Sequence, residues 1–139
     1  MPMGTWGTGI YDNDDAADWA AELSDGGLEA VESAFDAVLD LDYIDAGDAA
    51  CAVAAADVVA RLTSGRGDDS PHCEAVVEWV STHPSSPPPT LVAKALRALT
   101  QIGGESSELA ELWSDNSADE ADWRATLTEI ANRLNPGAE

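Results

Sequence analysis

A run of small, helix-favouring residues over positions 46–63 limits the fold of this 139-residue chain more than any other segment. Alanine recurs in it on several faces of a helix, and Asp45 stands where an N-cap residue is expected. The alternation of β-branched residues that is typical of strands is scarce in the whole chain. Because small side chains let neighbouring helices approach closely, we expect this helix to lie at the centre of an all-α domain.

Clusters of glycine and proline divide the rest of the chain into further helices. Between these clusters apolar residues recur every three or four positions, which predicts helices over 14–23, 28–40, 71–83, 89–102, 109–113 and 118–134. The length suits one domain, so we predict a single bundle of six or seven helices over residues 1–139, with a Pro-rich connector at 84–89. Its core is predicted to contain Trp19, Phe35, Val53, Leu99, Leu127 and Ile130.

The segment before the first helix has the most particular spacing in the chain. Gly7 and Gly9 leave the backbone free to turn beside Trp6, and Tyr11 adds a second ring. The short acceptors that follow, Asp12, Asn13 and Asp14, suit the free N–H groups at a helix start. We therefore interpret residues 1–13 as a strap that folds back onto the core, with Trp6 buried beneath it.

These residues also carry a resemblance. In this chain the pattern reads Trp6-Gly7-x-Gly9-x-Tyr11-Asp12-Asn13-Asp14-x-Ala16-x-Asp18-Trp19. It resembles the opening signature of a widespread bacterial family of small helical domains of unknown function. The segment 108–113 and the later Trp123 are similar to that family's C-terminal part. The resemblance implies a helical fold over nearly the whole chain. It implies no activity, since the family has no established one.

The net charge of −21 decides which partners are favoured. Every Lys and Arg lies after position 60, so the first 60 residues carry only acidic charge. Direct binding to nucleic acid or to an anionic membrane surface is disfavoured, because both require clustered basic residues. A basic protein or a cation is the natural complement. An acid-biased, high-salt proteome explains the same composition without any partner, since surplus acid keeps a small domain soluble and monomeric.

The sequence contains neither a hydrophobic run long enough to span a membrane nor a recognisable signal peptide. Its two cysteines fit no disulfide framework. We therefore expect a cytoplasmic protein, as a monomer or weak dimer.

The chemical candidates are few. Asp12, Asp14 and Asp18 offer the oxygen ligands that calcium or magnesium prefers, although helix capping explains the same residues. The loop is not an EF-hand, since Ala17 stands where that loop needs glycine. No nucleophile elbow, paired-base motif or phosphate-binding glycine loop is present in the sequence.

The favoured hypothesis is a non-catalytic interaction domain that binds a basic protein partner. Its predicted binding surface is an acidic face that contains Asp36, Asp40, Asp42 and Asp45. A second group of candidate binding residues is the N-terminal motif itself: Trp6, Gly7, Gly9, Tyr11, Asp12, Asn13, Asp14, Asp18 and Trp19. Two alternatives stay open: a divalent-cation-binding module at Asp12, Asp14 and Asp18, and an enzyme with an unrecognised site.

Overall fold

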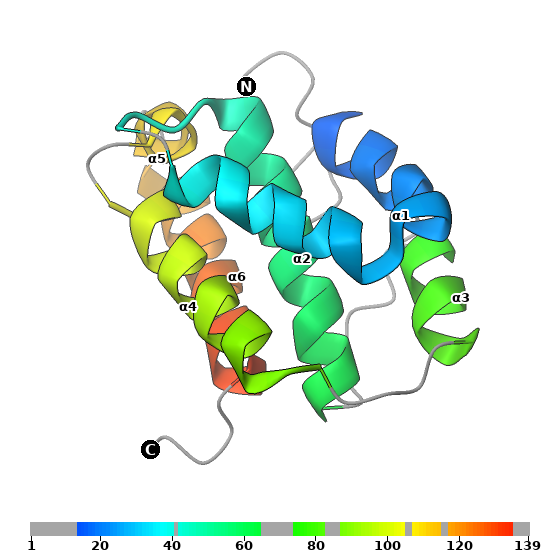
Figure 1. Ribbon diagram of the computed structural model, residues 1–139. Coiled ribbons are helices and arrows are strands. Elements are labelled where there is room, and N and C mark those ends of the chain that lie inside the picture. The colour runs from blue at the N-terminus through cyan, green and yellow to red at the C-terminus, as the bar shows by residue number, and fades with distance from the viewer. Residues whose placement is uncertain are drawn as a thin grey trace.

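The computed structural model describes residues 14–40, 42–64, 74–82, 87–104, 107–114 and 117–134. Six helices account for nearly all of them (Figure 1): α1 (Asp14–Leu39), α2 (Ala46–Ser64), α3 (Glu74–Thr82), α4 (Pro89–Ile102), α5 (Glu108–Ser114) and α6 (Ser117–Leu134). The described residues contain no strand, only an isolated parallel bridge between Ile44 and Ser107. The all-α prediction is confirmed.

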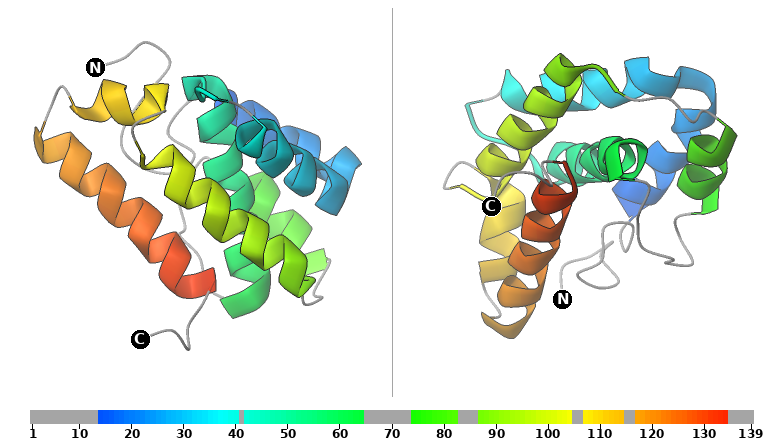
Figure 2. Two further views of the ribbon diagram at one scale, coloured as in Figure 1. Left: turned by 60° about the vertical axis from the view of Figure 1, so that its left-hand side comes forward. Right: turned by 90° about the horizontal axis from the view of Figure 1, so that it is seen from below.

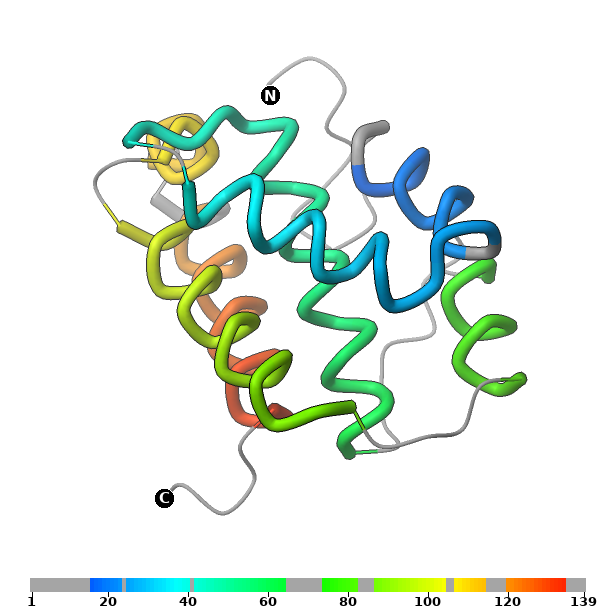
Figure 3. Tube along the Cα trace, in the orientation of Figure 1, coloured from blue at the N-terminus to red at the C-terminus, as the bar shows by residue number. Residues whose placement is uncertain are grey.

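The first helix is bent at a single residue. Gly27 has φ +57° and ψ −140°, which no residue inside an α-helix adopts, and Figure 3 shows the chain turning sharply between the two halves of α1. The sequence predicts a wider break over residues 24–27, but residues up to Gly26 remain helical. The two predicted helices are therefore two halves of α1 that meet at one glycine.

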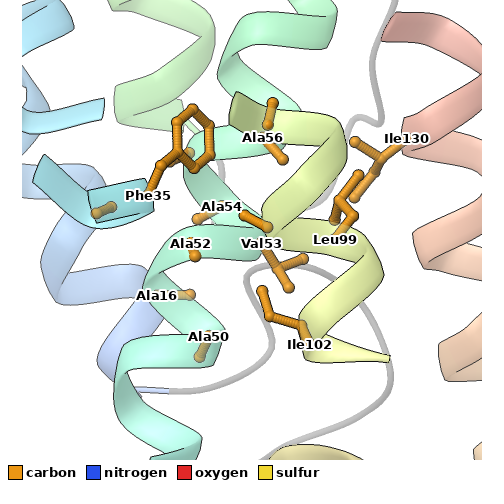
Figure 4. Close-up of a cluster of buried hydrophobic side chains, with 14 of the residues drawn as sticks. Ala16, Phe35, Ala50, Ala52, Val53, Ala54, Ala56, Leu99, Ile102 and Ile130 are labelled. Atoms are coloured by element: carbon orange, nitrogen blue, oxygen red, sulfur yellow. The ribbon is translucent and has the colours of Figure 1, made fainter. Parts of the chain in front are cut away.

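The alanine-rich helix α2 occupies the centre, as predicted. It packs against all five other helices, and every residue from Ala52 to Arg61 is buried. Figure 4 shows Phe35 of α1, Leu99 and Ile102 of α4 and Ile130 of α6 gathered around it. The small side chains permit this close approach from several directions. All six predicted core residues are buried: Trp19, Phe35, Val53, Leu99, Leu127 and Ile130.

The remaining helices surround α2 on different sides. Seen from below in Figure 2 (right), α3 lies to one side of α2 and α4 with α6 to the other, while the second half of α1 crosses above. The helix α5 packs against α2 and α6.

The helix α4 begins at Pro89 and is followed by Gly103, so its predicted range is confirmed. The predicted strap at 1–13, with Trp6, lies outside the described residues, as do Pro71 and residues 83–86 of the predicted Pro-rich connector. None of the described helices is long and apolar enough to cross a membrane.

Candidate functional site

The second half of α1 presents acidic side chains at helical spacing. Glu29, Glu32 and Asp36 of α1, and Asp40 directly after the helix, follow one another at intervals of three or four residues. The connection to α2 also contains Asp42 and Asp45. All six side chains are exposed except that of Asp36, which is half-buried. We call these six residues the acidic face; it includes the four residues that the sequence predicts for partner binding.

A lysine from α4 reaches this face. The Nζ atom of Lys94 lies 2.8 Å from Oδ1 of Asp36 and 3.0 Å from Oε2 of Glu32, so that one ammonium bridges two successive acidic residues of α1. Its hydrogen bonds to Asp36 and then to Glu32 raise the pKa of Lys94 above its usual value. From the sequence, the acidic residues of the first half have no basic residue near them in the chain. In the fold Asp36 has a counter-charge, because Lys94 lies 58 positions later in the sequence but next to it in space.

The helix α5 extends the acidic face beyond the end of α1. The Glu108 N–H donates to the Ile44 carbonyl at 2.9 Å, and its carboxylate accepts the Ala46 N–H at 2.8 Å. Because Ala46 is the first residue of α2, its N–H has no acceptor within that helix, and Glu108 supplies one. Asp45 precedes the helix as predicted, and its carbonyl accepts the Ala49 N–H.

Tyr43 lies beside this junction and is one of two large hydrophobic side chains that are exposed in the described part of the chain. Its hydroxyl donates to the Glu111 carboxylate. That hydrogen bond, with some burial and the charges of Glu111, Glu108 and Asp45, raises the pKa of Tyr43 to about 12. The sequence reasoning missed the two glutamates as neighbours of the acidic face, since no local pattern signals a contact between segments more than 60 positions apart.

A second charged group lies between α2 and α6; three of its members, Asp57, Arg61 and Arg133, are buried, and Glu129 is exposed. Asp57 of α2 has no exposed surface; its carboxylate contacts Nε of Arg61 at 2.7 Å and Nη2 of Arg133 at 2.5 Å. The Nε atom of Arg133 also contacts Glu129 at 2.7 Å. We call Asp57, Arg61, Glu129 and Arg133 the ionic cluster. It joins α2 to α6.

The ionic cluster is electrically balanced, with two carboxylates and two guanidinium groups. Burial by itself lowers the pKa of Arg133, but the charges and hydrogen bonds of Asp57 and Glu129 outweigh burial and raise it. No buried side-chain nitrogen or oxygen in the described residues lacks a hydrogen-bond partner. The cluster therefore holds two helices together, and its charged groups are paired with one another. The sequence reasoning missed it, although the spacing of four residues within 57–61 and 129–133 signals each half.

The N-terminal candidates lie mostly outside the described residues. Nothing is described of residues 1–13, nor of the side chain of Asp14. Trp19 is buried in the core and Asp18 is exposed. The described residues contain no group of three His, Cys, Asp or Glu side chains placed to hold a metal ion. The predicted calcium or magnesium site, which depends on Asp12 and Asp14, stays a prediction.

These features define a small all-helical domain with a buried ion-pair network and an acidic exterior. A family model described as a domain of unknown function (DUF4259) matches residues 4–126, and the chain belongs to that family. No curated protein and no solved structure matches the chain. The expected membership in a family of unknown function is thereby confirmed.

Proposed function

We propose that this domain is a non-catalytic binding module whose acidic face engages a basic protein. The observation that carries the proposal is the contact of Lys94 with Glu32 and Asp36. It is an intramolecular example of the interaction that we propose, because a lysine from a neighbouring helix bridges two acidic residues one turn apart. A partner with lysine or arginine side chains at similar spacing would extend the same contact along α1 and the 40–45 connection.

The distribution of basic residues supports this proposal. Of the five basic side chains that the structure describes, Arg61, Lys94, Arg124 and Arg133 already pair with acidic residues of the domain. The fifth, Arg97, is exposed. Within the described residues no basic side chain forms a salt bridge with the other members of the acidic face, namely Glu29, Asp40, Asp42 and Asp45. The negative electrostatic field of these four carboxylates therefore extends into the solvent, where it would steer a basic protein toward the acidic face.

Tyr43 adds an aromatic surface to the acidic face. Its side chain is 46% exposed, and carboxylates of the 40–45 connection and of α5 surround it. An aromatic ring next to carboxylates suits a guanidinium, which can lie over the ring and pair with an acidic group at once. The chain has an internal example, since Arg124 lies 5.6 Å from the Trp123 ring centre and also contacts Glu120. Arginine-rich partners are therefore favoured over lysine-rich ones.

A salt-dependent pull-down from the native lysate tests the proposal, with the charge removed in two different places. The test variant changes Asp36, Asp40, Asp42 and Asp45 to Asn. The matched control variant removes the same four charges elsewhere, at the exposed residues Glu22, Glu74, Glu78 and Asp122, by changes to Gln or Asn. Circular dichroism verifies that both variants remain folded.

A basic protein captured by the wild type and by the control variant, lost in the test variant and released by salt, supports the acidic face as a binding surface. Equal loss in both variants would show that only total charge matters, as in a high-salt adaptation. The competing divalent-cation module predicts instead a response to calcium or magnesium at constant ionic strength.

A further inference from the structure

The central helix offers its neighbours a shallow surface. Most of the buried residues of α2 are small, as Figure 4 shows for Ala50, Ala52, Ala54 and Ala56. The buried alanines of α2 are Ala49, Ala50, Ala52, Ala54, Ala55, Ala56 and Ala60. Such a helix provides few large side chains against which a partner helix can fix its position. Packing into the grooves between ridges is correspondingly less selective.

The helix that packs on it with an ionic contact, α6, has a repetitive apolar stripe. Trp123, Leu127, Ile130 and Leu134 are buried and follow one another at intervals of three or four residues. A displacement of α6 by one turn along its axis, in the direction of its C-terminus, places each of the first three near the former place of its successor. The apolar area that α6 buries against the smooth α2 would change little. Apolar contact with α2 therefore does not by itself choose one axial position of α6.

The ionic cluster distinguishes these positions. When α6 moves by one turn, either Glu129 or Ile130 comes to the former place of Arg133. Glu129 would bring a second carboxylate toward Asp57, and Ile130 would offer no charge. Since Asp57 has no exposed surface, water cannot replace the lost guanidinium. The displaced arrangements are unfavourable for this electrostatic reason.

We propose that the pair of Asp57 and Arg133 sets the axial position of α6 on α2. Removing two charges from water offsets much of their attraction, so the contribution of the pair is selection between packing arrangements rather than net stability. Because α6 follows α5 after two residues, the axial position of α6 also bears on where Glu108 and Glu111 lie, in addition to the contacts of α5 with the α1–α2 connection.

One other polar contact could compete for this role. Arg124 of α6 donates from Nη1 to the Gly103 carbonyl at the end of α4, at 2.9 Å. Its side chain is 46% exposed, so water can take the place of the carbonyl when α6 moves. The contact of Arg124 therefore selects weakly, and its removal serves as the matched control.

A distance measurement between α4 and α6 tests the proposal. Figures 1 and 2 show these helices side by side. Spin labels are attached to cysteines that replace the exposed Gln101 of α4 and the exposed Asn132 of α6, in a chain with Cys51→Ala and Cys73→Ser. The variants to be compared are Arg133→Met, the apolar triple Asp57→Leu/Arg61→Met/Arg133→Met, and the control Arg124→Met. In Arg133→Met the carboxylate of Asp57 keeps its contact with Arg61.

The wild type and the Arg124→Met control should give one narrow distance. Arg133→Met and the apolar triple should give a second distance that differs by about 5 Å, the rise of one helical turn. A single distance, unchanged from the wild type in both variants, would overturn the proposal. Unfolding of both variants, seen by circular dichroism, would also overturn it, because the pair would then stabilise the fold rather than select a position.

Discussion

The bend at Gly27 permits a prediction whose magnitude follows from backbone geometry. The change is Gly27→Ala. At φ +57° and ψ −140° an alanine is strained, and backbone strain of this kind costs about 1–3 kcal/mol. A Cβ atom at this position would lie 3.7 Å from Cζ2 of Trp79, which is an ordinary contact, so side-chain overlap adds nothing. Alanine also restricts the unfolded chain, which returns about 0.4–1 kcal/mol to the folded state. Taken at the middle of each range, the expected net loss in the free energy of unfolding is about 1.3 kcal/mol.

Gly103 provides the matched control for this measurement. Its φ of −79° and ψ of −3° suit any residue, and a Cβ atom there would meet its nearest neighbours at 3.6 Å. Gly103→Ala should therefore leave stability unchanged or raise it by less than about 1 kcal/mol. Urea unfolding followed by tryptophan fluorescence measures both variants. If Gly27→Ala were as stable as Gly103→Ala, the bend would not depend on glycine, and the explanation of the bend in α1 would be wrong.

Three further predictions concern charged groups. Asp57→Ala should lower the free energy of unfolding by about 3–5 kcal/mol, because it leaves two buried guanidinium groups without their shared carboxylate; thermal or urea unfolding measures this loss. Ultraviolet titration should find Tyr43 ionising near pH 12, and Glu111→Gln should bring its pKa back toward 10. The stabilisation that Tyr43 provides is fully present below about pH 10 and is lost as the pH rises through 12, since the raised pKa belongs to the folded state. If the N-terminal motif binds calcium or magnesium, millimolar ion should raise the unfolding temperature at matched ionic strength, and Asp12→Asn with Asp14→Asn should abolish the rise.

Most of the fold could be predicted from the sequence because local signals specify it. The alanine-rich run predicts α2, and glycine and proline mark the ends of α4, whose predicted range of 89–102 is the observed one. The sequence predicts a break over residues 24–27, which is longer than the observed one at Gly27. Two adjacent glycines and a serine signal a break in the helix, but only the backbone shows that Gly27 alone leaves the helical conformation.

The candidate site could be predicted only in part. The acidic residues of α1 and of the 40–45 connection form a local pattern, so the sequence contains them directly. The contacts that the sequence does not predict join distant segments. They pair Lys94 with Asp36, Glu111 with Tyr43 and Arg133 with Asp57. Such pairs depend on how the helices pack, and no spacing in a single sequence encodes them. For this reason the net charge of the sequence predicts an acidic exterior but does not reveal the ionic cluster.

The placement of the basic residues bears on the two explanations of the acidic exterior, a high-salt adaptation and a binding surface. Lys94 links α4 to α1, Arg124 links α6 to α4, and Arg133 links α6 to α2, so each of these residues acts at a contact between helices. Basic residues are thus present where packing uses them and scarce on the rest of the described surface. A high-salt adaptation removes basic side chains from the whole exterior alike, whereas a binding surface depends on particular carboxylates in a particular place. The two explanations predict the same composition, and they differ in whether four charges on the acidic face matter more than four charges elsewhere.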